Sequence, residues 1–277
     1  MRVFAISDVH TDFPENLQLL MGLSTSEYRE DALILAGDVS HDLTVLRRTL
    51  ELLLGRFRYL FFVPGNHELW VRNGGQSLEK FHTLLALCER LGVHTGPKCI
   101  GSDDERVCIV PLFSWYTRPE EGPDTLFRER PIEDPGGSVW TDDYLIKWPA
   151  GFLPTRSFLA LNEERVATSY AASVISFSHF MPRADLMFTL PGENPQLHSQ
   201  RTRHFNFSRV AGSTLIEEQI RRLGSKVHVY GHQHRNRCRE YEGVWYVSNC
   251  LGYREERRDR GDPPTIKEVS RLLRSGP

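Results

Sequence analysis

Five short apolar segments of this chain each run directly into side chains that can bind a metal ion. The segments are residues 3–7, 32–36, 59–63, 174–178 and 227–230. Their lengths and the turn residues that bound them are typical of buried strands, and helical patterns separate the first three. Strands that alternate with helices predict a parallel sheet with right-handed crossovers. The polar side chains after these strands should therefore lie where open α/β sheets bind their ligands.

The side chains that follow these strands are two carboxylates, one amide and four imidazoles. A lone Asp after a strand is usually a cap or a turn residue, so the recurrence is what indicates a site. Carboxylate oxygen with imidazole nitrogen suits Mn, Fe or Zn, and the lack of thiolates disfavours a structural zinc or iron–sulfur site. So many ligands suit two divalent metal ions about 3.5–4 Å apart that share one carboxylate. The candidate metal ligands are Asp8, His10, Asp38, Asn66, His179, His232 and His234.

Four of these ligands form two pairs in the sequence, and the two members of each pair have one residue between them. If the chain stays extended after each strand, residues i and i+2 point to the same side. Asp8 and His10 can then reach one ion, while His232 and His234 can supply one imidazole to each ion. His67 is an additional imidazole next to Asn66, and its expected catalytic role is a general acid that protonates a leaving alkoxide. The alternative is that His67 only supports the ligands and takes no part in proton transfer.

The motifs that contain these residues resemble, in order, the five motif blocks of the calcineurin-like metallophosphoesterase superfamily. The resemblance implies an α/β fold, a four-layer α/β/β/α sandwich with two facing mixed β-sheets. It implies hydrolysis of phosphate esters by a hydroxide that bridges two divalent metal ions. It also implies a division of ligands in which Asp38 bridges the ions. One ion takes Asp8, His10, Asp38 and His234, and the other takes Asp38, Asn66, His179 and His232.

The sequence after Gly37-Asp38 differs from the protein Ser/Thr phosphatase branch, because Val39-Ser40-His41-Asp42 replaces its Asp-Arg-Gly. We therefore expect a small phosphorylated substrate and a phosphomonoesterase or phosphodiesterase activity. The motifs also resemble class III cyclic-nucleotide phosphodiesterases, so a cyclic-nucleotide or nucleic-acid phosphodiesterase stays open. A net charge of -2 disfavours nucleic acid. An inactive protein-binding scaffold should have lost ligands, whereas every ligand is present. Residues 113–116 and 178–183 are similar to an uncharacterised plant and microbial subgroup, which implies no substrate.

We expect one domain over residues 1–277, with two segments that the strand–helix pattern does not explain. Residues 113–158 form an excursion rich in aromatic residues and proline, which either packs near the mouth of the site or forms a remote surface loop. The charged tail from about residue 254 is interpreted as a solvated or docking segment. Arg183 and Arg254 are candidate phosphate-binding side chains, with a surface salt bridge as the alternative for each.

The bulk composition, 25% charged and 40% apolar, is that of an ordinary globular protein. The first strand begins at the N-terminus and no apolar window has the length of a membrane span, so we expect a cytoplasmic protein. The cysteines form no close pair in the sequence, and we expect reduced thiols. They are Cys88, Cys99, Cys108, Cys238 and Cys250. The sequence gives no indication of the oligomeric state.

Overall fold

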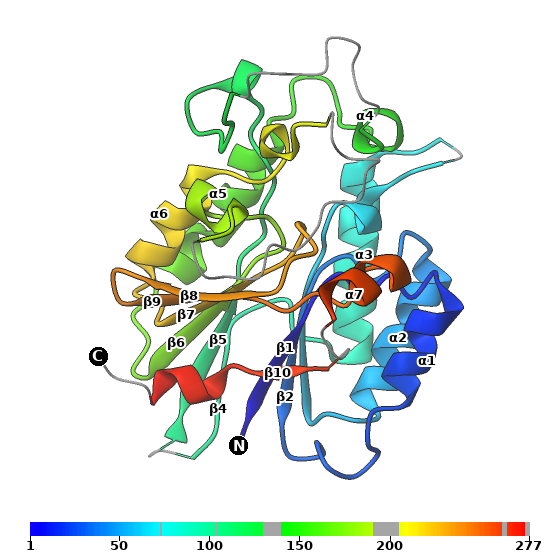
Figure 1. Ribbon diagram of the computed structural model, residues 1–277, viewed down its shortest axis with the longest axis vertical. Coiled ribbons are helices and arrows are strands. Elements are labelled where there is room, and N and C mark those ends of the chain that lie inside the picture. The colour runs from blue at the N-terminus through cyan, green and yellow to red at the C-terminus, as the bar shows by residue number, and fades with distance from the viewer. Residues whose placement is uncertain (73, 103–104, 130–139, 191–204, 262–264, 275–277) are drawn as a thin grey trace.

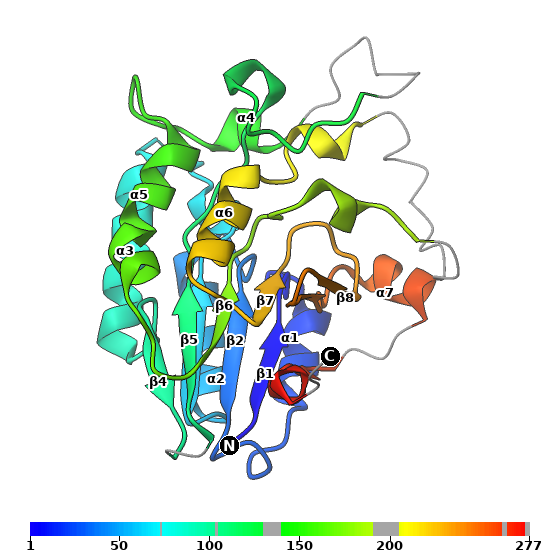
Figure 2. The ribbon, with the colours of Figure 1, turned by 90° about the vertical axis from the view of Figure 1, so that its left-hand side faces the viewer.

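Two mixed β-sheets lie between two layers of helices (Figure 1), which confirms the expected α/β fold. The computed structural model describes all residues except 73, 103–104, 130–139, 191–204, 262–264 and 275–277. One helical layer contains α1 (Pro14–Met21), α2 (Leu43–Leu54) and α3 (Ser77–Leu91). On the opposite side, α5 (Pro154–Ala167) and α6 (Thr214–Arg222) cover the second sheet, as Figure 2 shows from that side.

The first sheet has the strand order β10-β1-β2-β3. Strands β1 (Val3–Ile6), β2 (Ala32–Ala36) and β3 (Tyr59–Val63) are parallel, and β10 (Lys267–Glu268) pairs antiparallel with β1. Side chains alternate between the two faces of each strand. Leu33 and Leu35 of β2 belong to the core that contains the leucines of α2, while Ile34 belongs to the core shared with the second sheet.

The second sheet has the strand order β4-β5-β6-β7-β9-β8. Its parallel centre is flanked by two antiparallel edge strands, β4 and β8. The strands are β4 (Lys98–Ile100), β5 (Val107–Pro111), β6 (Ser173–Phe177), β7 (Val227–Tyr230), β8 (Arg237–Tyr241) and β9 (Val244–Ser248). Glu242 and Gly243 form the turn between β8 and β9, and both have the positive φ that a tight hairpin turn requires.

The helices begin and end at residues whose chemistry explains the boundary. Asp42 precedes α2, and its carboxylate accepts hydrogen bonds from the backbone N–H of Thr44 at 2.7 Å and of Val45 at 3.1 Å. Gly92 ends α3 with a φ of 76°, a conformation that glycine adopts without strain. Because β1, β2 and β3 are parallel, their carboxyl ends lie at the same edge of the first sheet.

A direct contact between the two sheets brings the ends of β1 and β9 together. The backbone N–H of Ser7 donates to the carbonyl of Asn249 at 3.0 Å, and the N–H of Leu251 donates to the carbonyl of Ser7 at 2.9 Å. Ser7 and Cys250 form an isolated parallel bridge at this point. The chain after β1 therefore lies within reach of residues from both sheets.

Two expectations about the periphery change with the structure. The charged tail forms a helix, α7 (Arg254–Arg260), and then β10 at the edge of the first sheet, so it is a docked segment and not a solvated one. The expectation of reduced thiols is wrong for Cys99 and Cys108, which form a disulfide. The register of β4 with β5 places these two residues opposite each other, which their spacing in the sequence did not reveal.

None of the described helices has both the length and the apolar character that a bilayer crossing needs.

The described parts of the 113–158 excursion pack on the protein core. Trp115 and Tyr116 are buried, and Trp115 contacts Trp148 and Phe180. A short helix, α4 (Asp142–Leu145), lies beyond residues 130–139, the part of the excursion that falls outside the described residues. The excursion is thus joined to the body of the fold on both sides of that gap.

If the tail is docked on the first sheet, truncation of its buried residue Val269 should destabilise the protein. This residue is fully buried, and its N–H donates to the carbonyl of Val3 at 2.8 Å. We expect Val269→Ala to lower the free energy of unfolding by about 1–3 kcal/mol, because it removes buried methyl groups. Met21→Ala, at a residue that is 57% exposed, should change it by less than about 0.5 kcal/mol. Urea denaturation measures both, and equal stability of the two variants would contradict docking.

Candidate metal centre

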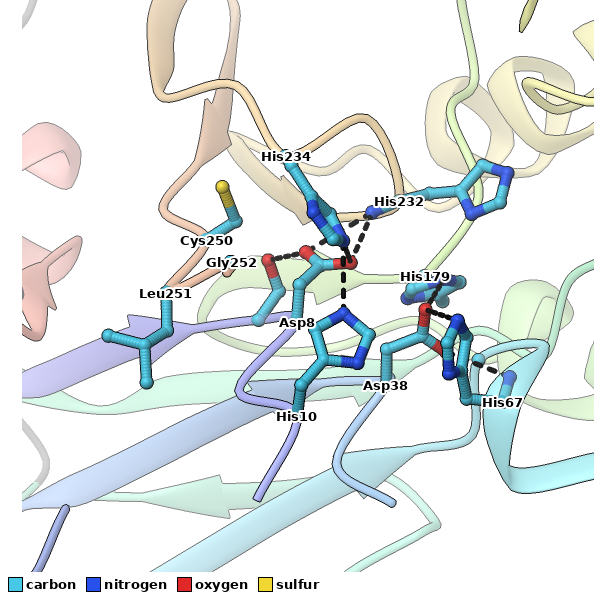
Figure 3. A network of polar contacts seen from close by, with 12 residues as sticks. Asp8, His10, Asp38, His67, His179, His232, His234, Cys250, Leu251 and Gly252 are labelled. Atoms are coloured by element: carbon cyan, nitrogen blue, oxygen red, sulfur yellow. Dashed lines mark hydrogen bonds and ion pairs between the residues drawn. The ribbon is translucent and has the colours of Figure 1, made fainter. Parts of the chain in front are cut away.

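The ends of five strands bring the candidate metal ligands together in two overlapping groups. Figure 3 shows six of the seven above the ends of the strands, namely Asp8, His10, Asp38, His179, His232 and His234. In each group, one nitrogen or oxygen of every residue lies within 4.8 Å of those of the others. Asp38 belongs to both groups, as a shared ligand must. The first group is Asp8, His10, Asp38 and His234, and the second is Asp38, His179 and His232. Asn66, the remaining candidate, is 1% exposed and precedes His67, whose backbone N–H donates to Asp38 Oδ1 at 3.0 Å.

The backbone that presents these residues is left-handed, so the expectation of an extended exit is wrong. Asp8 and His10 have φ values of 50° and 41°, Asp38 has 56°, and His232 and His234 have 73° and 55°. Such values are uncommon outside glycine and cost on the order of 1 kcal/mol per residue. Asp8 and His10 belong to the same ligand group, whereas His232 and His234 belong to different groups. Strain of this kind is concentrated at functional sites.

Glycines precede three of the ligand positions because a side chain there would collide with the site. A Cβ atom at Gly65 would lie 2.2 Å from Asp38 Oδ1, and one at Gly37 would lie 2.4 Å from His179 Nδ1. Both distances are shorter than any stable contact. The Gly37-Asp38 and Gly65-Asn66 pairs in the sequence therefore reflect close packing of neighbouring strand ends.

Backbone carbonyls fix the orientation of two imidazoles. His179 Nδ1 lies 2.9 Å from the carbonyl oxygen of Ala36, and His232 Nε2 lies 2.9 Å from that of Val210. A carbonyl only accepts hydrogen bonds, so each of these nitrogens carries a proton, and the other ring nitrogen is the one available to a cation. This is the arrangement of imidazoles that bind metal ions.

A carboxylate fixes the third imidazole. His234 Nδ1 lies 2.8 Å from Glu256 Oε2 of α7, and His234 Nε2 lies 3.0 Å from His10 Nε2. Burial opposes protonation of His234, yet Glu256 and Asp8 raise its pKa well above the usual value. The sequence did not indicate Glu256, because a glutamate in a charged tail has the pattern of a solvated residue.

Two buried polar atoms in this cluster have no hydrogen-bond partner among the described residues. They are Asn66 Oδ1 and His179 Nε2. Buried acceptors are normally satisfied, and two unsatisfied ones that belong to candidate ligands fit a site built around cations. Burial opposes the ionisation of Asp38, but His179 and His67 hold its pKa well below the usual value. The residues present therefore fit two divalent metal ions.

Glu68 supports the loops that carry the ligands. It is fully buried, and its carboxylate accepts four backbone hydrogen bonds. Oε2 accepts from Asp38 at 2.9 Å and from Gly65 at 2.7 Å, and Oε1 accepts from Val39 at 2.6 Å and from Ser40 at 3.0 Å. One carboxylate thus ties the chain after β2 to the chain after β3. Burial raises the pKa of Glu68 to about 7, while the four N–H donors favour its ionised form.

His67 lies at the rim of the cluster on an aromatic support. Its Nε2 is 3.8 Å from Asp38 Oδ2, and its ring centroid is 3.7 Å from that of Trp70. The edge of the His67 ring also meets the ring of His10, with centroids 4.7 Å apart. Burial lowers the pKa of His67, and Asp38 partly offsets that effect. The imidazole nitrogen is therefore held beside the shared carboxylate.

The two candidate arginines have different surroundings. Arg183 forms ion pairs with Asp185 at 2.7 Å and with Glu217 at 3.1 Å, so it shows the salt-bridge alternative. Arg254 is exposed at the start of α7, directly after Tyr253, whose ring stacks on His10 with centroids 4.7 Å apart. Arg254 is thus placed near the first group of ligands, and its binding of phosphate stays a prediction.

Comparison with known proteins gives a consistent result. The profile of the calcineurin-like phosphoesterase family matches residues 1–236. The acyl-carrier-protein phosphodiesterase PptH of Mycobacterium tuberculosis is 31% identical over 280 residues, covering 96% of this chain and 82% of that protein. The crystal structure of phosphopantetheinyl hydrolase (PptH) from the same organism superposes with a TM-score of 0.75 at 25% identity. That match covers 97% of this chain and 95% of that chain.

The contacts of Glu68 predict a large effect of Glu68→Gln. Whichever way the amide is turned, its NH₂ group faces two backbone N–H donors, so two hydrogen bonds are lost. We expect the free energy of unfolding to fall by about 2–4 kcal/mol. Glu89→Gln, at an exposed position on α3, should change it by less than about 0.5 kcal/mol. Urea denaturation provides the measurement, and a Glu68→Gln protein with unchanged stability would show that the carboxylate does not tie the loops.

Proposed function

This chain belongs to the calcineurin-like phosphoesterase family and is a hydrolase of phosphate ester bonds, and we propose that its substrate is the phosphodiester that joins a phosphopantetheine group to a carrier protein. The similarity to PptH carries this proposal, because the sequence match covers 96% of this chain and 82% of that protein, and the structural match covers 97% and 95% of the two chains. In this reaction water adds to phosphorus, and the bond from phosphorus to the serine oxygen breaks. The products are a phosphopantetheine monoester and an unmodified serine.

We propose that the two ligand groups hold two divalent metal ions, as the resemblance implied. The carboxylate and imidazole donors suit Mn, Fe or Zn. When bound, such ions lower the pKa of a water molecule and neutralise charge on the phosphate group. The first ion would be held by Asp8, His10, Asp38 and His234, and the second by Asp38, Asn66, His179 and His232.

We assign the protonation of the leaving group to His67. A serine alkoxide is a poor leaving group, so its Oγ must receive a proton as the bond to phosphorus breaks. His67 Nε2 faces the shared Asp38, and the ring is supported by Trp70. The side chain is therefore held where a leaving oxygen next to the ligand cluster would be within reach.

A direct test uses a carrier protein that bears phosphopantetheine. Incubation of this substrate with the enzyme and Mn²⁺ should yield the unmodified carrier protein and free phosphopantetheine, both detected by mass spectrometry. The Asp38→Asn variant, which lacks the shared carboxylate, should leave the substrate intact. Hydrolysis of bis-p-nitrophenyl phosphate without release of phosphopantetheine would keep the phosphoesterase assignment and refute the proposed substrate.

The role of His67 predicts a dependence on the leaving group. We expect His67→Ala to lower turnover of the carrier-protein substrate by roughly 100- to 10,000-fold, because the serine oxygen then lacks a proton donor. Turnover of bis-p-nitrophenyl phosphate should fall much less, since p-nitrophenolate leaves without protonation. His82→Ala, at an exposed position on α3, provides the matched control. Equal losses on both substrates would remove His67 from the role of acid.

A further inference from the structure

A buried carboxylate of the 113–158 excursion reaches the candidate metal centre. Asp142, the first residue of α4, is 3% exposed. Its Oδ1 accepts hydrogen bonds from Asn66 Nδ2 at 2.9 Å and from Trp70 Nε1 at 2.7 Å. Its Oδ2 accepts from the Tyr116 hydroxyl at 3.1 Å. Three donors, two from the segment after β3 and one from the excursion itself, thus converge on one side chain that the sequence did not single out.

The contact with Asn66 decides which way the amide faces. A carboxylate only accepts, so the NH₂ group of Asn66 must point toward Asp142 and its oxygen must point away. That oxygen is buried and has no hydrogen-bond partner among the described residues. With the amide turned over, its oxygen would face the Asp142 carboxylate and its NH₂ group would face the other ligands. Asp142 therefore selects the orientation in which Asn66 can bind a cation.

Asp142 also affects the position of His67, through its contact with Trp70. The Trp70 indole N–H donates to the carboxylate oxygen that also holds Asn66. The Trp70 ring in turn supports the ring of His67, with an angle of 31° between their planes. A single oxygen atom thus fixes a candidate metal ligand and the platform of the candidate acid.

We propose that Asp142 is a positioning residue that turns the Asn66 oxygen toward the second metal ion, so that the part of the excursion that contains Asp142 supports the site. This inference rests on the metal-binding role of Asn66 in the proposed function. If Asp142 has this role, the part of the excursion that contains it packs at the site and is not a remote surface loop. Asp142 acts through the geometry of its acceptor oxygen, and its negative charge is not required.

Three single variants test this inference through metal binding. Asp142→Ala removes the acceptor and should weaken the second of two Mn²⁺ equivalents by about 10- to 100-fold in calorimetric titration. Asp142→Asn should bind both equivalents as the parent does, because its carbonyl oxygen can accept from Asn66 and Trp70 while its NH₂ donates to Tyr116. Asp143→Ala is the matched control, since Asp143 is exposed and pairs with Arg118. It should also bind as the parent does.

A double variant separates positioning from a general loss of structure. If Asp142 acts through Asn66, then adding Asp142→Ala to Asn66→Ala should not weaken Mn²⁺ binding further. A further loss of the same factor in the Asn66→Ala background would overturn the inference. So would tight binding of two equivalents by Asp142→Ala.

The inference stays testable if Asp142→Ala does not fold. Asp142→Asn then decides alone, and loss of the second Mn²⁺ equivalent from this folded variant would overturn the inference. Failure of the proposed metal centre is a distinguishable result, because it would appear in the parent protein as fewer than two bound equivalents.

Discussion

The carboxylate of Glu68 is the interaction on which the rest of the site depends. Its four backbone hydrogen bonds hold the chain after β2 against the chain after β3, and they fix the left-handed turn at Asp38. A buried anion is unfavourable unless polar groups surround it, and here backbone donors satisfy both oxygens. The position of Asp38, and with it the overlap of the two ligand groups, follows from this one side chain.

Around that support, the orientation of four of the candidate ligands is set by residues outside the candidate set. Carbonyls of Ala36 and Val210 orient two imidazoles, Glu256 orients His234, and Asp142 orients Asn66. Glu256 comes from the charged tail and Asp142 from the excursion. The two segments without a recognisable strand–helix pattern thus supply carboxylates that direct donors toward the centre of the cluster. A ligand held by such a partner loses little conformational freedom on binding an ion.

Much of this arrangement could be predicted from the sequence. The five strands have buried apolar runs, and a ligand-type residue follows each run, so the strands and the composition of the cluster were predictable. The two facing mixed sheets were implied only by the family resemblance. The positive φ of Asp8 and His10 was not, because it depends on contacts with neighbouring strand ends. Asp142 and Glu256 carry no local signal, since acidic residues in short helices are usually solvated. The two residues of β10 are too few for any periodic pattern.

The pairing of β1 with β10 has a consequence for the order in which the molecule can be completed. β1 contains residues 3–6, whereas the strand that covers its outer edge contains residues 267–268. During synthesis from the N-terminus, β1 therefore leaves the ribosome long before its antiparallel neighbour exists. Until then the nascent chain presents a sheet edge with unsatisfied backbone groups. Glu256, which orients His234, also follows β1 by about 250 residues, so the ligand cluster reaches its final geometry only after that part of the chain has been synthesised.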